Sequence, residues 1–130
     1  MKRINLYRGK RLDNGQWIEG SLIGEDVIVG KIVDFEEDYF TTEFWYKVAP
    51  ETVGQFTGMT DKNGTKIFEG DIVRHIDTMC HVVEVVNSEV YFDTEMLEFG
   101  FRYSNELFHC QFNNEFEVIG NIYDNKELLK

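Results

Sequence analysis

The 130-residue sequence has one proline, two cysteines and no long apolar run, and these scarcities narrow the class of protein. No stretch approaches the ~18 uninterrupted apolar residues of a membrane-spanning helix. Residues 1–11 contain no apolar core of the length that a secretory signal needs. Without such a signal, the two thiols, Cys80 and Cys110, are expected to stay reduced. We therefore expect a cytoplasmic protein.

Sequence motifs that carry chemistry are missing too. Neither glycine-rich pattern of a phosphate-binding loop is present. None of the serines lies inside the G-x-S-x-G motif of hydrolases. The acidic run 36–38 lacks the ligand spacing of a calcium loop. The sequence therefore predicts no enzyme and no cofactor, and an unrecognised hydrolase or transferase remains only as an alternative.

The tempting metal ligands are two adjacent Cys–His pairs. These are Cys80 with His81 and His109 with Cys110, and His75 lies nearby in the sequence. Adjacent residues on a strand point to opposite faces, so each pair offers only one side chain to a common point. At most three ligands converge, one short of a tetrahedral structural site. We expect two buried free cysteines, surface histidines and no metal site.

Charge is distributed unevenly along the chain. The formal net charge is -11, yet the first eleven residues carry only cations: Lys2, Arg3, Arg8, Lys10 and Arg11. The strongly acidic remainder repels phosphate backbones, which disfavours general nucleic-acid binding. The basic residues are interpreted as a solvated arm or a partner of the acidic body, with a phosphate-contacting arm as the alternative.

Turn and strand signals predict an all-β, mainly antiparallel fold. Asn14-Gly15 and Asn63-Gly64 are pairs that favour the positive φ of hairpin turns. With 42% hydrophobic and 15% aromatic residues, the chain can build a packed core. The expected strands are Ile4 to Tyr7 as an edge strand, then 16–23, 26–34, 39–48, 71–76, 81–86, 90–93, 107–112 and 116–123.

Three further features of the sequence complete this prediction. Residues 95–103 fit a loop, a short helix or a strand equally well. Both Asn-Gly turns are followed by an apolar pair and Glu-Gly, which indicates either an internal duplication or chance. Near the end, Asp124 is placed to cap a short helix formed by residues 126–129.

Four blocks of sequence carry a family resemblance. They are LYRGKRLDNGQW at 6–17, PETVGQFTG at 50–58, IFEGDIV at 67–73 and FEVIGNIY at 116–123. In this order they resemble the YopX-like family of phage and prophage proteins, although Phe56 and Phe68 stand where related sequences often carry Tyr. The resemblance implies a phage-encoded, mainly β protein. It implies no catalytic residues, because the family has no established activity.

Together these observations predict one β domain over residues 1–130, with sub-units at 1–50 and 66–123, an SH3-like small barrel in the second half and a short C-terminal helix. The predicted function is that of a non-catalytic accessory protein that binds a host or phage protein or associates with itself. The alternatives are a basic arm that binds single-stranded nucleic acid and an acidic surface that mimics DNA. The expected interface residues are Tyr39, Trp45, Tyr103, Leu128 and Leu129.

Overall fold

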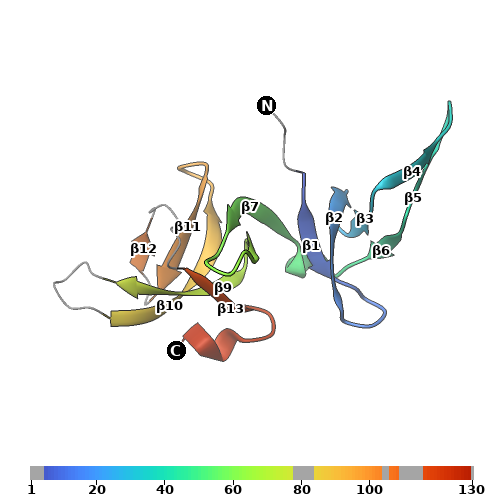
Figure 1. Cartoon of the computed structure of the whole chain (residues 1–130). Coiled ribbons are helices and arrows are strands. Elements are labelled where there is room, and N and C mark those ends of the chain that lie inside the picture. The colour runs from blue at the N-terminus through green and yellow to red at the C-terminus, as the bar shows by residue number, and fades with distance from the viewer. Residues whose placement is uncertain (1–4, 78–83, 104–105, 109–115, 130) are drawn as a thin grey trace. The chain divides into compact units, whose positions relative to one another are not determined.

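The computed structural model describes residues 5–77, 84–103, 106–108 and 116–129 (Figure 1). Almost all regular structure is antiparallel β-strand, and the two helices are short 3-10 turns. The all-β prediction is therefore confirmed. The chain divides into two compact units, Met1–Phe56 and Thr57–Lys130, and one strand, Gly54–Thr60, crosses the boundary between them. The prediction of one domain with sub-units at 1–50 and 66–123 stays a prediction.

The first unit is built from short strands joined mostly by tight turns. Its elements are β1 (Tyr7–Lys10), β2 (Trp17–Ile23), β3 (Val27–Val29), β4 (Ile32–Phe35), β5 (Phe40–Thr42), β6 (Trp45–Lys47), the 3-10 helix η1 (Pro50–Thr52) and the start of β7 (Gly54–Thr60). The strand order is β6-β3-β2-β1-β7, and β4 pairs only with β5. Its buried apolar side chains, among the described residues, are Ile28, Val29 and Val48.

The predicted strand Ile4 to Tyr7 overlaps the observed strand only at Tyr7, and its predicted edge role is wrong; Ile4 lies outside the described residues. The strand runs from Tyr7 to Lys10 and pairs with β2 on one side and β7 on the other. Gly9 permits this central position, since an added Cβ would lie 2.9 Å from a methyl of the buried Val48. The basic residues near the start of the sequence suggested a strand at the edge of a sheet. The close approach of Val48 to Gly9 instead allows this strand to lie between two others.

Two of the predicted strands are each interrupted by a bend, and the two bends lie opposite each other. Residues 26–34 split into β3 and β4 around Gly30, and residues 39–48 split into β5 and β6 around Glu43. The bends face each other, because the Gly30 amide donates to the Phe44 carbonyl and the Glu43 amide donates to the Lys31 carbonyl. A Cβ at Gly30 would lie 2.4 Å from the Glu43 side chain. A larger residue at this position would therefore have to displace the Glu43 side chain.

Both Asn-Gly turns are confirmed, and they separate β1 from β2 and β7 from β8. Gly15 has φ 70° and Gly64 has φ 81°, in the left-handed region that favours glycine. The two later Glu-Gly pairs differ in structure. Gly20 lies inside β2, where a Cβ would meet the Val29 carbonyl oxygen, whereas Gly70 has φ 92° in the turn between β8 and β9. The two Glu-Gly pairs are therefore similar in sequence but have different structural roles.

The second unit holds the five-stranded sheet. Its elements after β7 are β8 (Lys66–Phe68), β9 (Asp71–Asp77), β10 (Glu84–Asp93), β11 (Glu98–Tyr103), β12 (Glu106–Phe108), β13 (Glu117–Asn121) and the 3-10 helix η2 (Lys126–Leu129). Five of the strands form a sheet in the order β12-β11-β10-β9-β13. A closed SH3-like barrel stays a prediction. The short C-terminal helix is confirmed as η2.

The undecided segment 95–103 contains a turn followed by strand β11. The carboxylate of Asp93 accepts hydrogen bonds from the amides of Glu95 (2.8 Å) and Met96 (3.1 Å), and Leu97 completes the turn with φ 55°. Predicted strands 81–86 and 90–93 belong to one strand from Glu84 onward. Residues 81–83 and 109–112 of the predicted strands lie outside the described residues.

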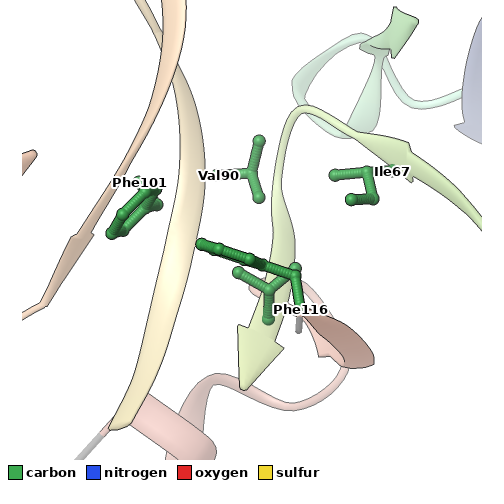
Figure 2. Packing of buried hydrophobic residues seen from close by; sticks show 5 residues of the cluster. Ile67, Val90, Phe101 and Phe116 are labelled. Carbon is green, nitrogen blue, oxygen red and sulfur yellow. The ribbon is translucent and has the colours of Figure 1, made fainter. Parts of the chain in front are cut away.

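An aromatic cluster holds the second unit together (Figure 2). Ile67, Val73, Val90, Phe101 and Phe116 form a buried apolar cluster, with Phe99 and Val118 packed against it. Within it the Phe101 and Phe116 rings meet edge to face at 5.0 Å between centroids. These side chains come from β8, β9, β10, β11 and the residue before β13. The cluster therefore joins strands that are distant in the sequence.

Candidate functional site

The β4–β5 hairpin is the least covered part of the first unit, and in Figure 1 it extends beyond β3 and β6. Every side chain from Lys31 to Thr41 is exposed. Its turn is closed by a hydrogen bond from the Glu36 amide to the Tyr39 carbonyl at 2.9 Å. Inside the turn the rings of Phe35 and Phe40 stack, with centroids 6.2 Å apart. The hairpin is thus ordered by its own contacts.

A β-bulge makes this hairpin amphipathic. Ile32 pairs with Thr42, Asp34 with Thr41 and Phe35 with Phe40, so that Val33 is the extra residue. Without the bulge, alternation would place Ile32 and Phe35 on opposite faces. The bulge brings both onto the face that carries Phe40, and the pair Asp34 and Thr41 lies on the other. One face of the hairpin is consequently apolar.

The exposed apolar side chains of the hairpin outnumber the buried ones that the structure describes in the first unit. Exposed fractions are 52% for Ile32, 62% for Val33, 73% for Phe35, 62% for Tyr39 and 49% for Phe40. A contiguous exposed apolar surface on a small domain marks an interaction site. A lone two-stranded hairpin is also only marginally stable in water. The hairpin therefore has the character of a surface that becomes covered.

A groove at the base of the hairpin adds to this surface. Residues 40–46 line an open hollow of about 540 Å³. Within this stretch the rings of Phe44 and Tyr46 stack at 5.8 Å, and Trp45 is 63% exposed. The groove and the hairpin form one continuous stretch of chain, residues 32–46. We call this stretch the hairpin surface.

The expected interface residues fall into three groups. Tyr39 and Trp45 lie in the hairpin surface and are both well exposed. Leu128 and Leu129 are half-buried in η2, and the Leu128 carbonyl accepts a hydrogen bond from the Asn87 amide group on β10 at 2.9 Å. The side chain of Tyr103 lies outside what the structure describes. Bulge placement, which no local signal revealed, adds Ile32, Val33, Phe35 and Phe40 to the set.

Three of the five basic residues near the start lie on the first unit's sheet. The guanidinium of Arg8 lies 4.9 Å and the ammonium of Lys10 5.8 Å from the ring centre of Trp17. Arg11 covers Tyr46 at 3.6 Å and forms an ion pair of 2.6 Å with Asp13. That hydrogen bond holds the pKa of Asp13 below its ordinary value. Lys2 and Arg3 lie outside the described residues.

The predicted surface position of His75 is wrong. The side chain is 6% exposed, and its ring stacks on Phe116 with centroids 4.7 Å apart. Its Nε2 lies 2.7 Å from the Ser88 hydroxyl, so a polar contact accompanies its burial. His81, His109, Cys80 and Cys110 lie outside the described residues. Within the residues that the structure does describe, no three potential ligands gather around a metal position.

Sequence reasoning missed the role of Asp61, a buried carboxylate at the β7–β8 turn. Its Oδ1 accepts hydrogen bonds from the amides of Asn63 (2.8 Å) and Thr65 (2.9 Å). Its Oδ2 accepts one from the Val118 amide at 2.9 Å, 57 residues away. Asp immediately before Lys-Asn-Gly is a local signal for the turn, because such carboxylates often bond the amide two residues on. Nothing local indicates the bond to Val118.

Asp61 makes stability depend on pH. Burial raises the pKa of its carboxyl group, but the three amide hydrogen bonds outweigh burial and hold the pKa below its ordinary value. A lowered folded-state pKa gives stability that is present above the unfolded pKa of about 3.9 and is lost as pH falls through the folded value. We expect the stability advantage of the wild type over Asp61→Asn to shrink below about pH 4. Urea unfolding across pH measures it, and a pH-independent difference would contradict the assignment.

Comparisons with known proteins agree on one family and one fold. The family model described as YopX protein matches residues 6–130. A crystal structure of protein EF1440 from Enterococcus faecalis superposes with a TM-score of 0.61 at 23% identity, covering 95% of this chain and 96% of that one. At this identity the likeness shows the fold alone. The search of curated proteins gave no match. No helix in the described part of the chain has the length and apolar character to cross a membrane.

Proposed function

This chain belongs to the YopX protein family, and we propose that it is a phage- or prophage-encoded accessory protein that binds another protein chain without catalysis. The observation that carries the proposal is the uncovered apolar face of the β4–β5 hairpin. Aromatic side chains on a small β scaffold are frequent anchors of protein interfaces. Phe35, Tyr39, Phe40 and Trp45 supply four such side chains within residues 32–46.

Non-catalytic action is part of the proposal. The buried titratable side chains among the described residues have structural roles. Asp61 fixes a turn, Asp71 accepts a hydrogen bond from the Phe68 amide at 2.7 Å, and His75 packs in the aromatic cluster. Each of these three side chains is buried. A host-cell cytoplasmic location follows from the same proposal, since it requires a host or phage protein as partner.

A second candidate function rests on the cations over Trp17. An aromatic ring flanked by basic side chains is a common platform for single-stranded nucleic acid, where bases stack on rings and cations follow the phosphates. Arg8 and Lys10 provide this pairing on the first unit's sheet. The net charge of -11 opposes it, because a strongly acidic protein repels phosphates at long range. Protein binding is therefore the favoured function.

Affinity capture from bacterial host lysate tests the proposal. We expect the tagged wild type to retain a defined protein. The double variant Phe35→Ser, Phe40→Ser should recover at least tenfold less of that protein, because central aromatic anchors contribute about 2 kcal/mol or more each. Leu12→Ser is the matched control, since Leu12 is 63% exposed and lies outside the hairpin surface. Equal recovery with all three proteins would contradict the proposal. Nuclease-sensitive recovery that requires Arg8 and Lys10 would favour the second candidate.

A further inference from the structure

We infer that the hairpin surface is covered by a second copy of this chain, with the two β4–β5 hairpins packed antiparallel about a two-fold axis. This inference rests on the proposed protein-binding function and names the partner. A two-fold interface uses the same patch on both chains, so a self-complementary apolar face suits it. The face carrying Ile32, Phe35 and Phe40 has this character.

The available area sets an upper limit on the strength of a dimer. An aromatic side chain presents about 200 Å² and an aliphatic one somewhat less. On the apolar face, Ile32, Phe35 and Phe40 have exposed fractions of 52%, 73% and 49%. They offer about 350 Å² per chain, so two copies would bury about 700 Å², which is in the range of weak, transient contacts. The expected dimer is therefore weak and forms only at high protein concentration.

Charge decides the relative direction of the two hairpins. The turn carries three consecutive acids, Glu36, Glu37 and Asp38, whereas Lys31 lies at the base. Parallel packing would bring the two acidic turns together, and like charges held close are destabilising. Antiparallel packing separates the two acidic turns and places each one near the base of the other hairpin, where Lys31 lies beside the Glu43 carboxylate that accepts a hydrogen bond from the Lys31 amide at 3.1 Å. The charge pattern thus favours the antiparallel arrangement.

Association of two copies would also stabilise each β4–β5 hairpin. Two strands alone form a marginal sheet, whereas apposed sheets bury their inner faces as in a β-sandwich. The Phe35 and Phe40 rings already stack within one chain. A second pair of rings packed on the first would remove water from both. The polar face with Asp34 and Thr41 would remain in solvent on the outside.

Sedimentation equilibrium over a wide range of concentrations tests the inference. We expect the wild type to approach twice the 15.3 kDa mass of one chain, and Phe35→Ser with Phe40→Ser to remain a monomer. These side chains are exposed, so the fold should survive, and far-UV circular dichroism checks this. Lys31→Glu should weaken the dimer at least fivefold, and adding Glu37→Lys should restore it, because the pair exchanges charges across the axis.

Each outcome supports or overturns the inference. A wild type that is monomeric at every concentration, or a dimer that survives the double serine substitution, overturns it. Failure of the Glu37→Lys rescue in an otherwise dimeric protein overturns the antiparallel arrangement. If the chain is a monomer and the hairpin still captures another protein from lysate, the second copy is the wrong partner while the proposed function stands. If neither association depends on the hairpin, both fail.

Discussion

Replacing Phe116 with alanine should lower the free energy of unfolding of the second unit by about 4 kcal/mol, since truncating a buried phenylalanine typically costs 3–5 kcal/mol. The ring is 3% exposed. It stacks on His75 at 4.7 Å and meets Phe101 at 5.0 Å. Removing it leaves a cavity beside a histidine whose polar contact would then be reached by water. The loss is large against the roughly 5–15 kcal/mol that stabilises a typical domain.

The measurement can separate the two units, because both tryptophans, Trp17 and Trp45, lie in the first. Far-UV circular dichroism in urea follows the whole chain, and tryptophan fluorescence follows the first unit. Phe116→Ala should shift the dichroism transition. A shared shift in fluorescence would show that the units unfold as one domain, and an unchanged fluorescence transition would show that they unfold separately. Met96→Ala, at a side chain 61% exposed, is the control, and an equal loss in both variants would contradict the prediction.

Replacing Asp61 with alanine should destabilise the second unit by about 3 kcal/mol, because hydrogen bonds to a charged group contribute about 1.5–3 kcal/mol each and water replaces part of them. Three amide donors, those of Asn63, Thr65 and Val118, lose their acceptor together. Two of them hold the turn and the third joins it to β13. The substitution therefore loosens a turn and a strand contact at once.

Two substitutions separate the causes of this loss. Asp61→Asn keeps one acceptor oxygen and should cost about half as much at neutral pH, in line with the smaller contribution of uncharged hydrogen bonds. Asp93→Ala removes a carboxylate that also accepts two amide hydrogen bonds but lies in the local turn between β10 and β11. It should cost only about 1 kcal/mol, the amount typical of a single cap or turn contact. Equal losses for Asp61→Ala and Asp93→Ala in urea unfolding would show that the bond to Val118 contributes nothing.

The acidic composition shapes both the fold and the interaction hypothesis. In the first unit Arg11 forms an ion pair with Asp13. In the second unit Lys62 lies 3.0 Å from Glu117, and Arg102 lies 3.1 Å from Glu89. These exposed pairs add little stability individually. The acids of residues 36–38 at the hairpin turn take part in none of these three pairs.

The sequence by itself determined the features that depend on neighbouring residues. Asn14-Gly15 and Asn63-Gly64 fix turns because glycine accepts positive φ at little cost, and alternating apolar residues fix the β class. The end-to-end family blocks fixed the family. These signals are local, so no knowledge of pairing partners was needed. Tyr39 and Trp45, which the sequence predicts as interface residues, are exposed, and their interface role stays a prediction.

Only the tertiary structure decided the features that depend on which strands meet. The place of β1 between two neighbours, the burial of His75 and the bond from Asp61 to Val118 all join residues that are 7 to 57 positions apart. The bulge at Val33 likewise exists only in the pairing of β4 with β5, and it alone gathers Ile32, Phe35 and Phe40 on one face. A local pattern encodes backbone preference but not pairing register. The candidate interaction surface could therefore be identified only from the pairing register of β4 and β5.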